Sequence, residues 1–410
     1  MAEPTPFNIH VADDLLKWIR QRVSTARIPP LVDLPADKKW SYGTPPDVVQ
    51  HLAHYWATAY DWRAVEARLN STFRQFTIPI SESGEDLTIH FVHHKSPHPN
   101  AIPLLFQHGW PGSFLEVGKI IDSLTNPEKP TQQQAYHVVA PSLPGFTFSS
   151  SPKKPGFGVR KMAAVNHKLM LALGYKKYMV QGGDWGSMVV RLMALDYPEA
   201  CKACHLNMMV ALPPSALRNP RELAYLALSW LTPTDKAMLG RLQWFMKHET
   251  GYSELQATKS QTLNYALMDS PVGILAWIRE KLEAASEDDY VWEDEDVITW
   301  VMLYLANGTS GHSEIFRDSK YGTLKADLLE RIIPPEVVVG GSWFPKEVYF
   351  IPRWWARCRV ATNIVYWKEH NKGGHFAAWE RPTELVEDVR EFTEKVPEES
   401  LEALRKAGSV

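Results

Sequence analysis

The 410-residue sequence has little cysteine, no long apolar run near its start and no large excess of charge, and each shortage excludes a class of protein. Three cysteines, Cys201, Cys204 and Cys358, cannot form the disulfide framework of a small secreted domain, so we interpret them as core thiols in a reducing compartment. Lysine and arginine together number 44, aspartate and glutamate 47, and no basic block stands out. We therefore expect no nucleic acid partner.

Residues 1–7 lack the basic start and apolar core of a signal segment, and no run of about 20 apolar residues follows them. We therefore expect a cytoplasmic protein without a membrane anchor. Internal repeats and low-complexity tracts are missing as well. With 45% apolar residues the chain can bury a large core, which favours one main domain with sizeable additions.

A glycine-rich segment at residues 181–187, Q-G-G-D-W-G-S, follows an apolar run that predicts a buried strand and precedes an apolar face at helical spacing. Glycines on both sides of Asp184 permit a strained turn that lifts its side chain above the edge of the sheet. A carboxylate in that position can attack an electrophilic carbon and form an ester that must then be hydrolysed. The alternative is an aspartate that caps the helix.

A second glycine-rich segment, residues 108–113, follows the apolar strand predicted at 102–106. A loop in this place can supply one backbone N–H group of an oxyanion hole, while the residue after the nucleophile supplies the other. These donors would be Trp110 and Trp185. The bond between Trp110 and Pro111 is a candidate cis peptide, because only a bond before proline makes that geometry cheap.

The third motif, Gly373-Gly374-His375-Phe376, stands just before an apolar helical stripe near the C-terminus. Taken alone, His375 is typical of a surface or packing histidine. Because it follows the aspartate turn in the order nucleophile, acid, histidine, we predict that it is the base.

Together with S-L-P-G-F at 142–146, these motifs resemble those of the microsomal-type epoxide hydrolases, particularly the soluble fungal members, in the α/β-hydrolase superfamily. The likeness covers nearly the whole chain. It implies the α/β-hydrolase fold, with a mostly parallel sheet flanked by helices, a helical cap and an N-terminal extension that wraps around both. The implied boundaries are 1–98 for the extension, 99–211 and 331–410 for the core, and 212–330 for the cap.

The resemblance also implies the chemistry. Asp184 would be the nucleophile, His375 the base that activates water, and Glu347 the acid that orients this histidine. Tyr252 matches the first of two cap tyrosines that donate hydrogen bonds to the opening epoxide oxygen. The reaction would convert a small apolar epoxide and water into a vicinal diol without a metal or an organic cofactor. The sequence is compatible with a homodimer.

The sequence departs from the family at Phe316, which falls where the second cap tyrosine is expected and cannot donate a hydrogen bond. Either Tyr252 acts alone, or a neighbour substitutes, or the substrate is not a simple epoxide. The candidate substitutes are Tyr304, Tyr321 and His312.

Trp277 lies in a stretch, 270–281, that closely matches the caps of this family, and it would either line the substrate pocket or hold the cap together. We include Trp277 and Phe316 among the candidate substrate-binding residues.

Three other functions stay open. A displacement like that of haloalkane dehalogenases also uses an aspartate nucleophile, but it needs halide-binding N–H donors, and Tyr252 argues against it. An epoxide-opening cyclase, in which the substrate supplies its own nucleophile, is kept open by the missing tyrosine. A binding protein that retains only the shell of a hydrolase would not need Asp184, Glu347 and His375 together.

Overall fold

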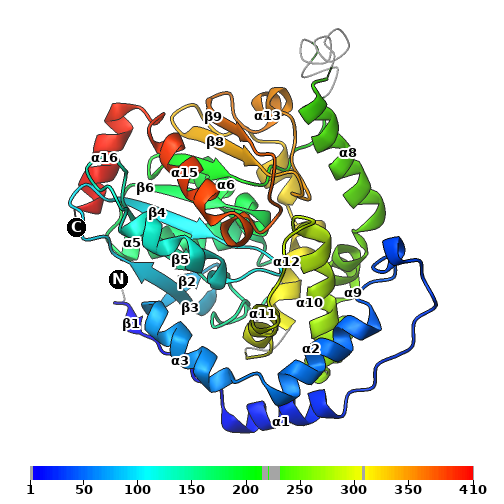
Figure 1. Cartoon of the computed structure of the whole chain (residues 1–410). Coiled ribbons are helices and arrows are strands. Elements are labelled where there is room, and N and C mark those ends of the chain that lie inside the picture. Colours follow the sequence, from blue (N-terminus) through cyan, green and yellow to red (C-terminus); the bar gives the residue numbers. More distant parts are fainter. Residues whose placement is uncertain (1–2, 215–219, 221–230, 307–309, 410) are drawn as a thin grey trace.

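A nine-stranded sheet runs through the part of the chain that the computed structural model describes, residues 3–214, 220, 231–306 and 310–409 (Figure 1). The strand order across the sheet is β1-β2-β3-β5-β4-β6-β7-β8-β9. The strands are β1 (Thr5–Pro6), β2 (Gln75–Glu82), β3 (Glu85–His94), β4 (Ile102–Gln107), β5 (Tyr136–Pro141), β6 (Tyr178–Gly182), β7 (Cys201–Leu206), β8 (Val338–Trp343) and β9 (Ile364–Glu369).

The sheet has an antiparallel edge and a parallel centre. Strands β1, β2, β3 and β5 pair antiparallel, and the pairs from β5 across to β9 are parallel. Every residue of β4, β5, β6 and β8 is buried, as expected of parallel strands that have both faces covered. The apolar runs that precede the two glycine-rich segments therefore predicted β4 and β6 correctly. Strands β1, β2 and β3 of the antiparallel edge come from residues that we assigned to the N-terminal extension.

Helices cover both faces of the sheet because the chain reverses its direction across it. It moves from β4 to β5 through α4 (Ile121–Thr125), then returns past β4 to β6 and β7 through α5 (Val159–Ala172) and α6 (Asp184–Asp196). Right-handed crossovers in opposite directions place α4 on one face and α5 and α6 on the other. Arg390 of α15 (Pro382–Thr393) donates a hydrogen bond to the Ser123 carbonyl of α4, so α15 covers the same face as α4.

Between β7 and β8 the described residues form helices and no strand, and we call α8–α12 the cap helices. Residues 215–219, 221–230 and 307–309 of the segment that we predicted as a cap lie outside the described residues. The cap helices are α8 (Pro233–His248), α9 (Gly251–Asp269), α10 (Pro271–Ala285), α11 (Asp294–Ala306) and α12 (Ser310–Tyr321), followed by the short η3 (Lys325–Leu329).

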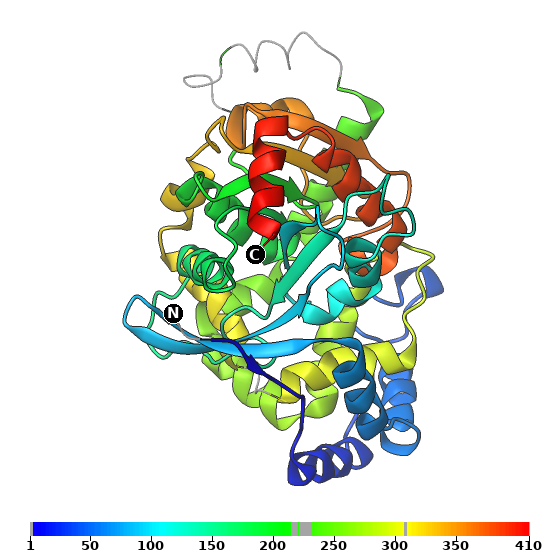
Figure 2. The same ribbon diagram turned by 90° about the vertical axis from the view of Figure 1, so that its left-hand side faces the viewer.

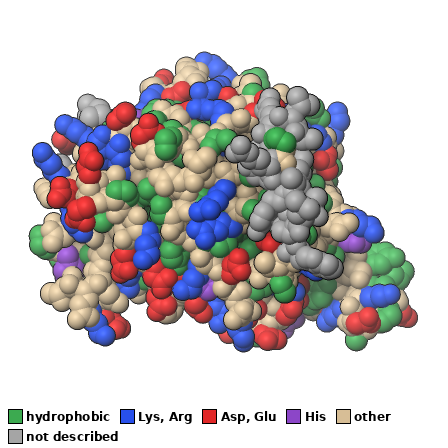
Figure 3. Space-filling view, turned by 90° about the horizontal axis from the view of Figure 1, so that it is seen from above, with side chains coloured by type: hydrophobic (Ala, Val, Ile, Leu, Met, Phe, Trp, Pro, Cys, Tyr) green, Lys and Arg blue, Asp and Glu red, His purple; other side chains and the backbone are tan. Residues whose placement is uncertain are grey.

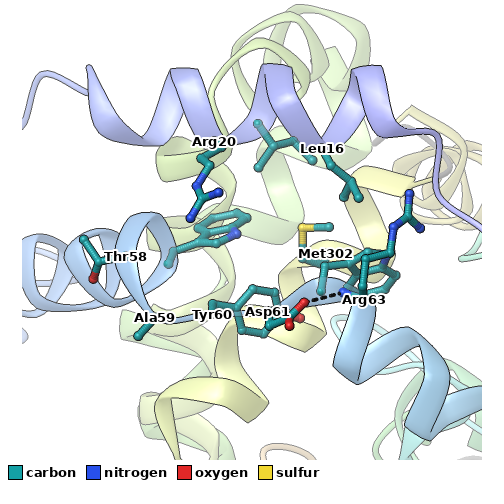
Figure 4. Close-up of a pocket in the computed structure, with 11 residues that line it drawn as sticks. Leu16, Arg20, Thr58, Ala59, Tyr60, Asp61, Arg63 and Met302 are labelled. Atoms are coloured by element: carbon teal, nitrogen blue, oxygen red, sulfur yellow. Dashed lines mark hydrogen bonds between the residues drawn. The ribbon is translucent and has the colours of Figure 1, made fainter.

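The N-terminal helices pack on the cap helices rather than standing apart (Figures 1 and 2). They are η1 (Ala36–Lys38), α1 (Asp13–Ser24), α2 (Pro46–Thr58) and α3 (Trp62–Thr72). The Thr44 hydroxyl donates to the Ala276 carbonyl of α10 at 2.7 Å, and the Tyr60 and Thr299 hydroxyls are 3.0 Å apart. A pocket of about 430 Å³ lies at this junction. Leu16 and Arg20 of α1 and Met302 of α11 are among the residues that line it (Figure 4).

The surface carries mixed charge. Figure 3 shows acidic and basic side chains interspersed over one face of the molecule, consistent with a formal net charge of −3. None of the helices in the described ranges is both long enough and apolar enough to cross a membrane.

Buried Arg191 of α6 ties both ends of the cap segment to the helix that follows Asp184. Its guanidinium donates to the carbonyls of Val210, which precedes the cap helices, and of Leu328 and Arg331, which follow them, at 2.7, 3.2 and 2.9 Å. A fourth bond, of 2.9 Å, reaches the Arg359 carbonyl at the end of α13 (Arg353–Arg359). One side chain therefore gives a hydrogen-bond donor to four carbonyl groups, which lie on the segments before and after the cap helices and at the end of α13.

Replacing Arg191 by methionine should lower the free energy of unfolding by at least about 3 kcal/mol, because several carbonyls would lose their donor at once. Arg357→Met, at an exposed arginine of α13, is the control and should change it by no more than about 0.5 kcal/mol. Urea unfolding followed by circular dichroism measures both values. Equal unfolding midpoints for the two variants would show that Arg191 does not anchor the cap connections.

Candidate active site

The predicted site residues come from loops at the carboxyl ends of four parallel strands. The loop with Trp110 follows β4, Asp184 follows β6, Glu347 follows β8, and His375 follows β9. Loops in these places meet at one edge of a parallel sheet, the usual location of a ligand site in this architecture. The structure brings all four residues together, although they are far apart in the sequence.

Asp184 occupies the sharp turn that the glycines predicted. Its φ of +48° lies in the left-handed region, which is uncommon for a residue other than glycine. The turn packs so closely against the end of β4 that a Cβ atom at Gly186 would lie 2.1 Å from the Gln107 carbonyl oxygen. The strained conformation is thus held by backbone packing, and helix α6 begins immediately at Asp184.

Each carboxylate oxygen of Asp184 has its own partner. The backbone N–H of Trp110 donates to Oδ1 at 2.7 Å, and Nε2 of His375 lies 3.3 Å from Oδ2. Trp185 stands in the first turn of α6, where N–H groups have no acceptor within the helix. Of the two predicted oxyanion donors, the Trp110 N–H therefore already binds the Asp184 carboxylate, and the role of the Trp185 N–H stays a prediction.

His375 is held between two carboxylates. Its Nδ1 lies 2.9 and 3.1 Å from the two oxygens of Glu347, whose Oε1 also accepts hydrogen bonds from the N–H groups of Val348 and Tyr349. Burial alone would lower the pKa of His375, but the charges of Glu347 and Asp184 outweigh it and raise the pKa well above its usual value. The imidazole is therefore a cation in the resting site.

The loop after β4 has the predicted cis peptide bond between Trp110 and Pro111. Two cap side chains hold its carbonyls. The Trp300 indole N–H donates to the Pro111 oxygen, and the Tyr304 hydroxyl donates to the Gly112 oxygen at 2.7 Å. Helix α11, which carries both side chains, is thus locked to the loop that positions the Trp110 N–H.

An aromatic cluster lies beside the Asp184 carboxylate. The Tyr252 ring stacks on the Trp110 ring, with centroids 4.9 Å apart and planes 14° apart. Phe316 meets Trp110, Trp185 and Tyr252 edge-on, at centroid distances of 5.6, 4.9 and 5.9 Å. Phe316 therefore faces the same space as Tyr252, and the position where the second tyrosine was expected carries no hydroxyl.

The three candidate substitutes for that hydroxyl differ in their exposure and in their hydrogen bonds. Tyr321 is 63% exposed on the surface, so it does not serve as a donor in the site. Tyr304 is buried, but its hydroxyl hydrogen is already given to Gly112. His312 is buried one turn before Phe316, neither ring nitrogen has a hydrogen-bond partner among the residues that the structure describes, and burial lowers its pKa to about 3.

Trp277 stands on α10, and its buried indole nitrogen has no hydrogen-bond partner in the described ranges. Within the described part of the chain it makes none of the ring contacts that join Trp110, Tyr252 and Phe316. Its predicted contact with substrate stays a prediction.

The surroundings of Lys281 were not predicted from the sequence. Its side chain is buried, and its ammonium lies 4.7 Å from the centroid of the Tyr252 ring. The ammonium also pairs with Glu249 and Glu280 at 2.9 and 2.6 Å. Burial raises the pKa of Tyr252, and the charge of Asp184 adds to this effect, so the phenol keeps its proton. The available signal was the position of Lys281 at helical spacing from the apolar residues Ile274 and Ile278, on the buried face of α10.

Cys201 and Cys204 are fully buried in β7, as predicted, and Cys358 is partly buried on α13. Among the described residues, no group of three or more histidine, cysteine, aspartate or glutamate side chains is arranged to hold a metal ion.

A mostly parallel sheet with an aspartate on the strand-to-helix turn after β6, and a glutamate and a histidine after later strands, defines an α/β-hydrolase with a carboxylate at the nucleophile position. Residues 102–257 match the family model for the alpha/beta hydrolase fold, and residues 4–117 match the model described as the epoxide hydrolase N terminus.

Similar proteins narrow the class further. Epoxide hydrolase 1 of Sus scrofa is 33% identical to the chain, over 94% of the chain and 88% of that protein. The solved structure of Aspergillus niger epoxide hydrolase is 33% identical, with a TM-score of 0.80 over 96% of this chain and 97% of that one. The crystal structure of juvenile hormone epoxide hydrolase from the silkworm Bombyx mori gives a TM-score of 0.84 at 28% identity, over 97% and 95%. The chain belongs to the epoxide hydrolase family.

Proposed function

We propose that the protein hydrolyses an epoxide to a vicinal diol through a covalent ester on Asp184. The observation that carries this proposal is the state of the Asp184 carboxylate, which has one oxygen bound by the Trp110 N–H and the other beside His375. A carboxylate held in this way is a nucleophile with its base and its oxyanion donor already in place.

In the first step an Asp184 oxygen attacks one epoxide carbon, a carbon–oxygen bond of the ring breaks, and the Tyr252 phenol donates a hydrogen bond to the departing oxygen. Because Oδ1 is bound by the Trp110 N–H, Oδ2 is the attacking atom and Oδ1 becomes the carbonyl oxygen of the ester. Ring strain provides the electrophile, so these side chains suffice for the step.

The charge on His375 balances the protons of this step. The imidazolium is stabilised by Glu347 and Asp184, and esterification removes the negative charge of Asp184. The pKa of His375 must then fall, so His375 releases one proton. The epoxide oxygen takes up one proton, and the first half-reaction is therefore balanced. Ester formation also converts His375 into a neutral base.

In the second step His375 takes a proton from water, and the water oxygen bonds to the ester carbonyl carbon. The N–H groups of Trp110 and Trp185 stabilise the resulting oxyanion. When this intermediate collapses, the diol oxygen leaves with one proton and the other stays on His375, which restores the pair with Asp184. Glu347 holds the imidazolium in orientation throughout.

The aromatic cluster of Trp110, Trp185, Tyr252 and Phe316 supports a small apolar substrate, such as an aryl epoxide, because flat rings pack favourably against one another. Trp277 as a pocket residue, a cytoplasmic location and a homodimer belong to this proposal as further predictions.

We expect His375→Gln to react once with an epoxide and stop, because Asp184 keeps its ability to attack while the ester loses its base. Mass spectrometry of the digested protein should then find the full mass of the epoxide on the peptide that contains Asp184. The doubly substituted protein, with Asp184→Ala added, is the control and should carry no adduct. Diol formation by His375→Gln without any adduct would favour direct attack by water.

Tyr252→Phe should lower the rate of alkylation by about a hundredfold or more, the usual cost of losing an oxyanion donor. Phe316→Tyr adds a second hydroxyl where the ring already faces Tyr252, so it should raise kcat/KM for a small aryl epoxide by about tenfold, or about 1.4 kcal/mol. Stopped-flow and steady-state kinetics on one epoxide measure both effects.

A large loss in Tyr252→Phe without a gain in Phe316→Tyr would mean that another group, such as His312, already serves as the second donor. If neither variant differs from the wild type, the result would favour an epoxide-opening cyclase over a simple epoxide hydrolase.

A further inference from the structure

The proposed mechanism does not use one carboxyl group that lies beside the site. Glu116 belongs to the short 3-10 helix η2 (Phe114–Lys119), directly after the loop that carries Trp110. Its side chain folds back against this loop, where a Cβ atom at Gly112 would lie 1.7 Å from Glu116 Oε1. Glycine at 112 therefore leaves the space that the Glu116 carboxyl fills.

The same loop touches the nucleophile. A Cβ atom at Gly109 would lie 2.1 Å from Asp184 Oδ1, and one at Gly112 would lie 3.2 Å from the Gly109 carbonyl oxygen. At each of these two glycines the missing side chain leaves room for a carboxyl group, that of Asp184 at Gly109 and that of Glu116 at Gly112. Both carboxyl groups therefore lie against the same short loop.

Water can reach the Asp184 side chain. It keeps 16% of its surface exposed, whereas Trp110, Pro111 and Gly112, which lie between Asp184 and Glu116, are buried. A hydrolytic water that attacks the Asp184 ester has to stand in this part of the molecule.

Burial keeps the Glu116 carboxyl neutral. Burial raises its pKa to about 8, the cation of His375 opposes this effect, and the charges of Asp184 and Glu347 add to it. The Tyr304 phenol of α11 also faces Glu116 and stays protonated, because burial raises its pKa. At neutral pH Glu116 is a carboxylic acid, which has one oxygen that donates a hydrogen bond and another that accepts one.

We propose that Glu116 is a positioning residue that holds the hydrolytic water against the Asp184 ester while His375 removes its proton. The inference rests on the proposed function. One water proton goes to Nε2 of His375, the water oxygen bonds to the ester carbonyl carbon, and the second O–H stays hydrogen bonded to Glu116. A hydrogen bond to His375 alone leaves the water free to rotate, and a second contact fixes the attacking lone pair.

Two variants separate this role from simple space filling. Glu116→Gln keeps a neutral group that donates and accepts hydrogen bonds, whereas Glu116→Leu keeps the approximate volume and removes both functions. In single-turnover stopped-flow experiments with styrene oxide, both variants should form the ester within about threefold of the wild-type rate. Hydrolysis of the ester should slow by about tenfold or more in Glu116→Leu and by less than about threefold in Glu116→Gln.

The pH profile is an independent readout. In the wild type, hydrolysis should fall as pH rises through the pKa of Glu116, which is about 8 in the resting site, because ionised Glu116 places a negative charge beside the developing oxyanion. Glu116→Gln should lose this fall, and Glu128→Gln, at an exposed glutamate, should keep it.

Wild-type hydrolysis in Glu116→Leu, or an equal slowing of both half-reactions, would overturn the inference. If Glu116→Leu does not fold, a fall near pH 8 that persists in Glu116→Gln would overturn it equally well. A wild-type enzyme that forms no ester at all would instead overturn the proposed function, and single-turnover kinetics of the wild type together with the adduct test on His375→Gln would show this before any Glu116 variant is tested.

Discussion

The buried ion pair of His375 with Asp184 and Glu347 is the interaction on which the rest of the site depends. A cation in the interior is stable only while carboxylates face both of its nitrogens, and the structure supplies one from the loop after β6 and one from the loop after β8. Esterification would cancel one of these charges. His375 would thus be a cation while Asp184 is charged and a neutral base once Asp184 is esterified.

This arrangement constrains the surrounding fold. Asp184 reaches His375 only from a strained turn, which close packing of the turn against β4 maintains. The loop after β4 must approach the same carboxylate, and Trp300 and Tyr304 of the cap helix α11 fix its carbonyls. The N-terminal helices hold the cap helices from the other side, and Arg191 joins both cap connections to α6. Parts of the chain far from Asp184 therefore contribute to its geometry.

The sequence predicted the parts of the structure that local pattern determines. Apolar runs predicted strands, because a buried strand requires apolar residues. Glycines around Asp184 indicated the turn, because a sharp turn favours glycine. The packing of Lys281 on Tyr252 and of Glu116 against Gly112 was not predicted, since each joins segments whose distance only the folded chain sets. Phe316 was recognised as an exception by resemblance, but only the structure shows that its ring faces Trp110 and Tyr252.

The covalent ester on Asp184 is the central claim, and the source of the oxygen in the product tests it most directly. A single turnover of excess enzyme with styrene oxide in ¹⁸O-water should give a diol without heavy oxygen, because the added oxygen comes from the Asp184 carboxylate. The label should instead appear in the peptide that contains Asp184. Full labelling of the diol in the first turnover would contradict the account, since the oxygen would then come directly from water.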